Sequence, residues 1–328
     1  VSSCWAEEQA AELVERFGYG ASGRTYIIAD LEEGWLFCVI QGKHWLARRV
    51  GDDEVAMVAN TYTVRKVDLS DTENILASKD IRNYASQRGW YKADEDGVFD
   101  FAAVFADPRS AAHPVNYGRQ SIGLRYVAAN PLAIGNTPPF SVVPSKKLGV
   151  ADLIKVLRHN GSGSINTVDG KEVRCDVSEA ICRGSTQTSF VARLSRSPVR
   201  DLGIVYWVCL SAPETSVFIP FLFAGTGFPE AFRGEAERPS QELFDQKVKS
   251  AFRPDASQAF WTFSNFRDKA QAMPDELRTQ LLREAEAIEF EATESLGRTS
   301  NTATAEQLMD YSDQVYRSAL KLMAKHAG

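Results

Sequence analysis

The sequence predicts a mixed α+β protein. The sequence contains two blocks of short sequential strands, together with amphipathic helical segments. It shows neither the regular strand–helix–strand repeat of a parallel α/β fold nor a glycine-rich nucleotide-binding fingerprint. The 328 residues are 44% hydrophobic and 24% charged, which is an ordinary globular composition. These observations favour antiparallel sheets packed with helices over a parallel nucleotide-binding fold.

The first strand block lies between residues 24 and 64. Apolar and β-branched runs over 25–29, 35–40, 45–50 and 55–64 are separated by short Gly- and Asp-containing turns. Because these connections are too short for crossover helices, we expect an antiparallel meander in which each run pairs with the one before it. The fourth run carries Asn60, whose amide needs hydrogen-bond partners or a functional role if it is buried.

The remaining elements follow from periodicity and from Gly and Pro. Helices are expected over 3–17, 74–88, 119–129 and 150–160, with loops over 107–118 and 130–144. The second strand block comprises 189–194, 203–210 and 216–220, and residues 225–256 look like a surface segment. Two long helices over 274–296 and 303–326 predict an αα-hairpin. We therefore expect a core domain over residues 1–270 and a helical hairpin over 271–328 packed on it.

Charge and hydropathy exclude two classes of partner. The net charge is −6, from 37 Lys and Arg against 43 Asp and Glu, and the basic residues are scattered, so nucleic acid is not expected as a partner. No apolar run approaches the roughly 18 residues that span a bilayer, and the first residues lack the pattern of a signal peptide. A cytoplasmic location is expected, with a periplasmic or secreted one left open if a preceding segment held a signal.

Cysteine and histidine usage favours structural thiols and no metal. The five cysteines lie in or beside apolar runs, which is typical of buried thiols in a reducing compartment, and a single Cys175–Cys182 disulfide is the alternative. The four histidines are not spaced with Cys, Asp or Glu as metal ligands are. No metal site and no cofactor are expected.

An ordered set of motifs carries a family resemblance. The set includes AAELVERFGYGASGRTYIIAD, GKHWLARRVGDDEVAMVANTYTV, the loop NYGR, PSKKLGVADLIKVLRH, AICRGSTQTSFVARL and GIVYWVCLSAPETSVFIP. In this order the motifs resemble the dipeptidase A and secernin-like cysteine peptidases of the N-terminal-nucleophile (Ntn) hydrolase superfamily. Each motif alone is weak, but their shared order from Ala10 to Pro220 is specific.

The resemblance implies a four-layer αββα sandwich that hydrolyses amide bonds in dipeptides or short peptides. In that chemistry an N-terminal Cys thiol attacks the carbonyl carbon and the chain's own α-amine takes the proton, so no histidine is needed. Asn60 falls where related enzymes carry an asparagine of the oxyanion hole, and Arg119 falls where they carry an arginine beside the nucleophile.

The departures from the family pattern concern the nucleophile. Family members begin with the nucleophilic Cys on a first strand, in a segment that this sequence does not contain, so a companion N-terminal segment or chain, released by autoprocessing or otherwise separate, is expected to supply it. Cys4 is a poor substitute because it leads into a helix and is not the terminal residue. Cys38 stands where the family pattern EAWxxE has a glutamate.

Two alternative functions remain compatible with the sequence. One is an amidase or acylase that acts on a non-peptide amide, and the other is a non-catalytic binding or scaffold homologue that has lost its nucleophile. Exposed sheet edges would favour aggregation, so we also expect another chain or a symmetry mate to cover them, which predicts an oligomer. The expected ligand in the main hypothesis is a short peptide.

Overall fold

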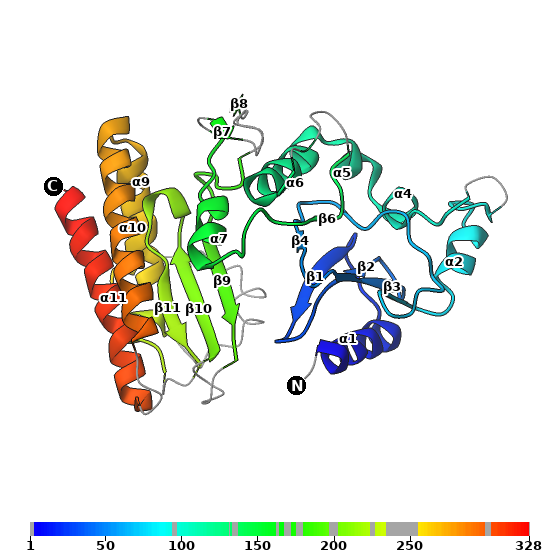
Figure 1. Ribbon diagram of the computed structural model, residues 1–328, viewed down its shortest axis with the longest axis horizontal. Helices are drawn as coiled ribbons and strands as arrows, with labels where there is room; N and C mark the ends of the chain where they lie inside the picture. The colour runs from blue at the N-terminus through cyan, green and yellow to red at the C-terminus, as the bar shows by residue number, and fades with distance from the viewer. Residues whose placement is uncertain are drawn as a thin grey trace. The chain divides into compact units, whose positions relative to one another are not determined.

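The structure is a computed structural model that describes residues 3–93, 97–130, 132, 137–161, 164–166, 172–174, 180–196, 203–223, 227–233, 255–298 and 303–327. Its elements are mixed α and β, and every pairing between the described strands is antiparallel, as the α+β class predicts (Figure 1). The chain forms two compact units, residues 1–148 with 161–180 and residues 149–160 with 181–328. The expected division at residue 270 and the αββα layering stay predictions.

The first unit contains a sheet in the strand order β1-β2-β3-β5. Its strands are β1 (Arg24–Ala29), β2 (Gly34–Val39), β3 (Trp45–Val50) and β5 (Ile75–Ala77). The first three confirm the predicted meander, with Thr25 opposite Cys38 and Phe37 opposite Ala47.

The predicted fourth strand of the meander is wrong. β4 covers only Val55–Ala56 and pairs with β6 (Ser141–Val142), while β5 occupies the place beside β3. Consequently the helix expected over 74–88 is reduced to α2 (Ile81–Gln87). The apolar residues after β4 instead cross the face of the sheet, where Tyr62 and Val64 are buried in the core. The apolar side chains after β4 are therefore buried by packing on the face of the sheet, and the segment does not pair as a further strand of that sheet.

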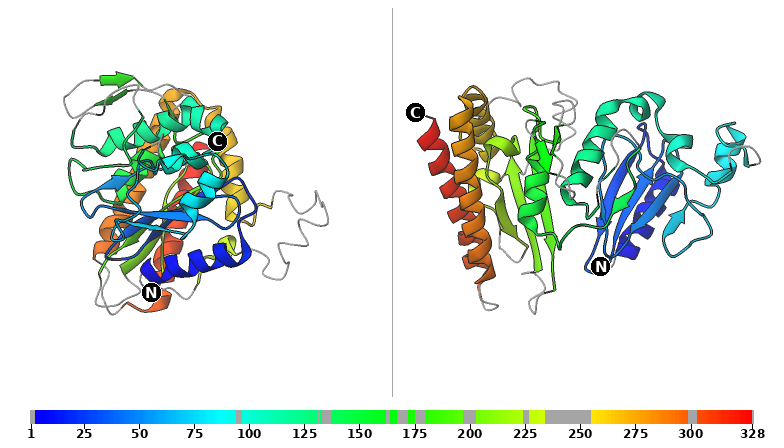
Figure 2. Two further views of the ribbon diagram at one scale, coloured as in Figure 1. Left: turned by 90° about the vertical axis from the view of Figure 1, so that its right-hand side faces the viewer. Right: turned by 45° about the horizontal axis from the view of Figure 1, so that its top comes forward.

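The two faces of this sheet are covered differently. Helix α1 (Ser3–Phe17) lies along one face and buries Trp35, Phe37 and Val39 with its own Ala11 (Figure 2). On the other face Leu36 and the alternating residues pack against the chain after β4, against α2 and against α4 (Phe101–Phe105).

The loop expected over 107–118 is mostly helical. It forms α5 (Pro108–Ala112) and the first residues of α6 (Pro114–Val127). Asp107 caps α5 through its side chain, and both helices have proline in the first turn, where the missing N–H costs nothing.

The second unit contains the sheet β11-β10-β9. Its strands are β9 (Thr188–Leu194), β10 (Ile204–Leu210) and β11 (Ile219–Leu222), close to the predicted second block. Its helices are α7 (Val150–Leu157), α9 (Ala259–Gln271), α10 (Asp275–Gly297) and α11 (Ala305–His326). Alternate residues of β10, among them Trp207, are buried with α9, α10 and α11 in one core.

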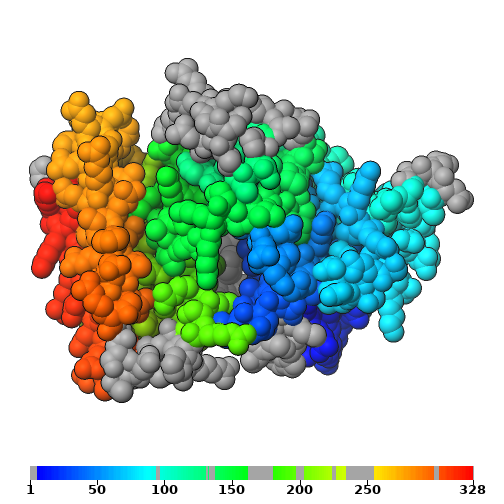
Figure 3. Space-filling model, viewed as in Figure 1, coloured from blue at the N-terminus to red at the C-terminus, as the bar shows by residue number. Residues whose placement is uncertain are grey.

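The predicted αα-hairpin is confirmed in the second unit. Helices α10 and α11 begin and end within a few residues of the expected bounds and lie against each other along their lengths (Figure 3). Helix α9 was not predicted, and most of the segment 225–256 lies outside the described residues.

The remaining described elements are short. Strands β7 (Ser164–Asn166) and β8 (Glu172–Arg174) form a separate pair, and two short 3₁₀ helices cover Pro213–Thr215 and Glu230–Phe232. No helix within the described ranges combines the length and the apolar composition that a bilayer crossing requires.

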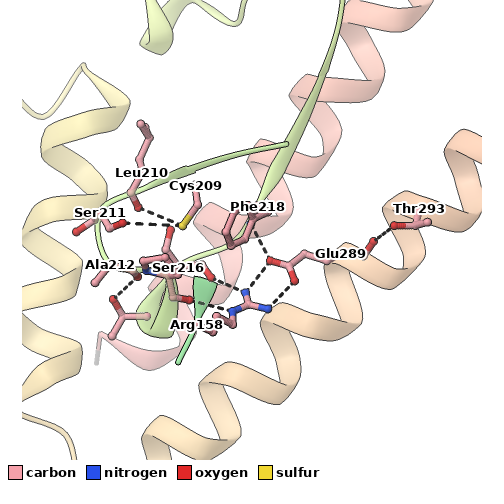
Figure 4. Close-up of polar contacts among 11 residues, drawn as sticks. Arg158, Cys209, Leu210, Ser211, Ala212, Ser216, Phe218, Glu289 and Thr293 are labelled. Carbon is pink, nitrogen blue, oxygen red and sulfur yellow. Dashed lines mark hydrogen bonds and ion pairs between the residues drawn. The ribbon is translucent and has the colours of Figure 1, made fainter. Parts of the chain in front are cut away.

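A buried ion pair joins three segments of the second unit. The Nη atoms of Arg158 donate to the carboxylate of Glu289 at 2.7 and 2.8 Å. The same guanidinium also donates to the carbonyl oxygens of Pro213 and Ser216, each at 3.0 Å, and the backbone N–H of Phe218 donates to Glu289 at 2.7 Å. These bonds connect the end of α7, the turn before β11 and the middle of α10 (Figure 4).

Candidate functional site

A hollow of about 370 Å³ in the first unit is the candidate site. It is formed by the start of β1, the turn after β4 and the beginning of α5. Its lining consists of Ser22, Gly23, Arg24, Thr25, Val58, Ala59, Asn60, Thr61, Tyr62, Ala106, Asp107 and Ser110. Hydroxyl, amide and charged side chains dominate this lining, so the hollow suits a small polar ligand.

A close contact between Gly23 and Tyr62 builds one wall. Gly23 has φ of 130°, and a Cβ there would lie 1.9 Å from the Tyr62 hydroxyl oxygen. That hydroxyl donates to the carbonyl oxygen of Val39, and burial raises the pKa of Tyr62. Only glycine at position 23 allows this approach.

Asn60 lies in the hollow, in a turn and not on a strand as the sequence predicted. Its carbonyl oxygen accepts a hydrogen bond from Nδ2 of Asn116 on α6, at 3.4 Å, and the same Nδ2 donates to the carbonyl oxygen of Ser110 at 2.8 Å. Asn116 is only 6% exposed. A buried amide therefore holds the Asn60 turn against α5 and α6, while the Asn60 side chain stays exposed.

Opposite charges line the same hollow. The Asp107 carboxylate accepts from the backbone N–H groups of Ser110 and Arg109, at 3.0 and 2.8 Å, and these bonds, with that of Ser110 first, lower the pKa of Asp107. Asp107 is thus ionised at neutral pH and lies 3.8 Å from the guanidinium of the exposed Arg109, while Arg24 supplies a positive charge at the start of β1. A ligand with an ammonium group and a carbonyl or carboxylate group fits this distribution.

Arg119 belongs to the same unit but is not one of the residues that line the hollow. It is half-buried on α6, and its Nε donates to the carbonyl oxygen of Ala180 at 3.1 Å. It follows Asn116 by three positions on the helix, so the two side chains project from neighbouring positions on one face. The structure thus brings Asn60 into the hollow, whereas Arg119 is not among the residues that line it and donates to Ala180 instead.

The described thiols are unsuited to nucleophilic attack. Cys38, Cys182 and Cys209 are free and at most 2% exposed, and burial raises the pKa of each to about 12. Since the thiolate is the reactive form, these groups are inert at neutral pH, which confirms them as core thiols. Cys175 and the side chain of Cys4 lie outside the described residues.

Cys38 nevertheless contacts a residue that lines the hollow. Its Sγ is 3.4 Å from Oγ1 of Thr25, which lines the hollow. The position where the family pattern has a glutamate is thus one side chain away from the candidate site.

Sequence reasoning did not find several residues of the site, namely Thr25, Tyr62, Asp107, Ser110 and Asn116. Asp107 followed by Pro108 is a helix-start signal that could have revealed the cap. The others carry no local signal, because they become significant only when distant segments meet.

The comparisons with known proteins agree with the resemblance. Fold and site together define a mixed α and β protein with a polar hollow of ligand size. A sequence profile described as peptidase family C69 matches residues 6–267, so the chain belongs to peptidase family C69.

Three relatives that the chain resembles are named as probable dipeptidases. The chain is 22% identical over 293 residues to a probable dipeptidase B of Streptococcus pyogenes serotype M1, covering 85% of this chain and 55% of the relative. It is 24% identical over 234 residues to a probable dipeptidase of Latilactobacillus sakei, covering 69% and 48%. A probable dipeptidase of Salmonella dublin is 25% identical over 215 residues, covering 64% and 49%. The chain thus spans about half the length of these relatives.

Proposed function

We propose that this chain is part of a cysteine peptidase of the N-terminal-nucleophile type that hydrolyses dipeptides or short peptides. In this proposal the thiol is carried by polypeptide outside the 328 residues. Asn60 donates to the developing oxyanion, and Arg119 is the active-site arginine. The membership of peptidase family C69 and the names of the relatives support peptide hydrolysis.

One observation carries the assignment of Asn60. Its exposed side-chain amide lies in a polar hollow, and its backbone carbonyl oxygen accepts a hydrogen bond from Nδ2 of Asn116. A donor that is already positioned stabilises a developing negative charge without reorganising at the moment of reaction. Such a donor is typically worth about 2.7 to 4 kcal/mol of barrier.

The high pKa values of the described thiols support a nucleophilic thiol on polypeptide outside the 328 residues. Cys38, Cys182 and Cys209 are buried and have pKa values near 12, so none of the described thiols fits the role. The companion segment predicted from the sequence therefore stays part of the proposal.

Charge in the hollow favours peptides with a free amino end. The ionised Asp107 would hold the ammonium group, and Arg24 would lie near a carbonyl or carboxylate further along. An N-acylated amide lacks the ammonium group, so it would not form an ion pair with Asp107. A dependence of hydrolysis on Asp107 therefore distinguishes the dipeptidase hypothesis from the acylase alternative.

The test compares Asp107→Asn with wild type on two substrates. Asn keeps the helix cap but removes the charge. We expect kcat/KM for a dipeptide to fall at least about tenfold, and kcat/KM for the N-acetylated dipeptide to stay unchanged. Asp100→Asn is the matched control, because Asp100 caps α4 in the same way, accepting from Ala103 at 2.9 Å, outside the hollow.

Two results would contradict the proposal. Faster hydrolysis of N-acylated than of free dipeptides, with no effect of Asp107→Asn, would favour the acylase. Intact-mass measurement of an active preparation that finds no polypeptide outside residues 1–328 would refute the external thiol.

A further inference from the structure

Helix α1 is held on the first sheet by a small apolar surface and one buried acid. It lies against β1 and β2 (Figure 2). Among its described side chains only Glu7 and Ala11 are buried, at 2% and 9% exposed, and Val14 is partly buried. Its large apolar residues Leu13 and Phe17 are 57% and 69% exposed. Because so little apolar surface attaches α1, the protonation state of the buried acid has a large effect on that attachment.

The Glu7 carboxylate lacks the kind of partner that another glutamate of the same helix has. Oε1 of Glu15 accepts a hydrogen bond from Nε1 of Trp45 at 2.9 Å. Within the part of the chain that the structure describes, neither carboxylate oxygen of Glu7 has a hydrogen-bond partner, and neither does the buried Nε1 of Trp35. A buried carboxylate ion without a partner is strongly unfavourable, whereas the neutral acid costs much less.

The charged groups around α1 do not compensate an ionised Glu7. Burial, followed by the carboxylates of Glu33 and Asp30 in the turn after β1, raises the pKa of Glu7 to about 8. Arg49 of β3 lies opposite Trp35, but its guanidinium donates to Glu33 at 3.2 Å and to Asp52 at 2.5 Å. The sheet face under α1 has no titratable residue on β2. The remaining described titratable groups of α1, the turn and this face of β1 are Glu8, Glu12, Glu15, Arg16, Glu32, Arg24 and Tyr26.

The chain after α1 allows the helix to move without disturbing the hollow. The helix ends at Gly18, which has φ of 77°, a conformation that favours glycine. Tyr19 then exchanges two backbone hydrogen bonds with Gly42, at 2.7 and 3.0 Å. This anchor lies between α1 and Ser22, the first residue that lines the hollow. A rotation at Gly18 can therefore separate α1 from the sheet while the wall of the hollow stays in place.

We propose that α1 is a detachable cover of the first sheet, which is released when Glu7 loses its proton. Release uncovers the apolar side chains of Trp35, Phe37 and Val39 on β2, which α1 buries in the attached state. The ionised carboxylate gains water in the released state, and α1 returns when Glu7 is protonated again. Exposure of this apolar face is thereby coupled to pH. The proposal does not depend on the proposed function.

Proton linkage fixes the size and the sign of the effect. In the released state Glu7 has its ordinary pKa of 4.5, and in the attached state its pKa is about 8. Between these values each release is accompanied by the loss of one proton, so the equilibrium constant for release rises about tenfold per pH unit. Below pH 4.5 and above pH 8 the constant no longer depends on Glu7.

Amide hydrogen exchange, corrected at each pH for the chemical exchange rate, tests the release of α1. We expect α1 to be less protected than β2, and its protection to fall about tenfold per unit between pH 5 and pH 7.5. Glu7→Gln should remove this dependence, and Glu12→Gln, an exposed change on the same helix, should preserve it. Equal protection of α1 and β2 at every pH would show that the helix opens only with global unfolding and would overturn the proposal. A dependence that survives Glu7→Gln would do so too.

A thiol placed under the helix tests which surface is uncovered. Ala47 of β3 is 0% exposed and lies opposite Phe37 in the cluster that α1 covers. At pH 8 we expect iodoacetamide to modify the thiol introduced by Ala47→Cys at least tenfold faster with Glu7 than with Glu7→Gln. Both proteins are compared at one pH, so the difference reports access to the thiol. Cys38, buried on the other face of the sheet, is the internal control and should react equally in both. Equal modification of the introduced thiol in the two proteins would contradict the release of α1.

Discussion

The position of Asn60 in the hollow depends in part on a hydrogen bond from a residue distant in the chain. Its side chain is free to face a ligand because its backbone carbonyl is held by Asn116, which lies 56 positions further along the chain and donates also to Ser110. Loss of both bonds would leave the buried Asn116 amide unsatisfied, at a cost of about 1 to 3 kcal/mol, and the bond to Ser110, at 2.8 Å, is the shorter of the two. The arrangement lets an exposed amide be well positioned.

Substitution of Asn60 by alanine should affect catalysis and not stability. We expect kcat/KM on a dipeptide to fall by about 10² to 10³, the usual effect of removing one oxyanion donor. Thermal unfolding should change little because the side chain is exposed. Asn83→Ala, the same change at an exposed position of α2, is the control and should leave both quantities as they are. Unchanged hydrolysis in the Asn60 variant would remove this residue from the site.

Glu7 on α1 is a second residue with unusual surroundings. It is 2% exposed, and within the described residues neither carboxylate oxygen has a hydrogen-bond partner. Burial, followed by the nearby carboxylates of Glu33 and Asp30, raises the pKa of Glu7 from 4.5 to about 8. Below that value Glu7 is protonated in the folded chain.

The raised pKa predicts a pH dependence of stability. Between pH 4.5 and pH 8 the unfolded chain loses this proton and the folded chain keeps it, so the free energy of unfolding falls as pH rises. The total change is of the order of a few kcal/mol, at about 1.36 kcal/mol per pKa unit. Glu7→Gln should flatten denaturant-derived stability over this range, and Glu12→Gln, an exposed change on the same helix, should not. Equal slopes for wild type and Glu7→Gln would contradict the assignment.

At the level of helices and strands, a buried ion pair joins elements that also pack together in the hydrophobic core. In the second unit the Arg158 guanidinium joins α7, the turn before β11 and α10 through bonds to Glu289, Pro213 and Ser216. Both members of the pair are under 10% exposed. A buried pair of this kind gives little net stability over an apolar pair, but it is costly to break from one side.

A double-mutant cycle on Arg158 and Glu289 measures this asymmetry. Arg158→Met or Glu289→Leu alone should lower the free energy of unfolding by about 3 to 5 kcal/mol, because each leaves a buried charge unpaired. The double variant should lose less than the sum of the two, by at least about 1 kcal/mol. Arg317→Met with Asp313→Leu, an ion pair on α11 whose arginine is 71% exposed, serves as the surface control and should be nearly additive. Additivity at the buried pair would show that the two charges do not depend on each other.

At the scale of the whole molecule, the two compact units share one property: their described thiols are buried. Cys38 lies in the first unit, and Cys182 and Cys209 lie in the second. The elevated pKa of each keeps it protonated, so reactivity toward thiol reagents requires unfolding.

Alkylation of the active enzyme should therefore separate structural from catalytic thiols. With iodoacetamide at pH 7.5, we expect peptide mapping to find Cys38, Cys182 and Cys209 unmodified in the folded protein and modified in denaturant. Loss of dipeptidase activity should accompany labelling of a cysteine on polypeptide outside residues 1–328. Labelling of any of the three buried thiols in step with inactivation would contradict both the burial argument and the external nucleophile.

The local architecture and the family can be predicted from the sequence alone. Short turns specified β1, β2 and β3, and helical periodicity specified α1 and the α10–α11 hairpin, because these elements form from contacts between residues close in the chain. The order of motifs indicated the dipeptidase A-like peptidases, and the C69 profile agrees.

Which distant segments meet depends on long-range packing, which local sequence patterns do not reveal. Pairing of β3 with β5 and of β4 with β6 depends on which run best buries its apolar residues, and local periodicity cannot rank such choices. The hollow depends on the same long-range packing, since it needs residues 22–25, 58–62 and 106–110 in one place, with Asn116 holding the middle segment. Sequence could name Asn60, but the exposure of its side chain and the hydrogen bond that its carbonyl oxygen accepts from Asn116 follow from chain packing alone.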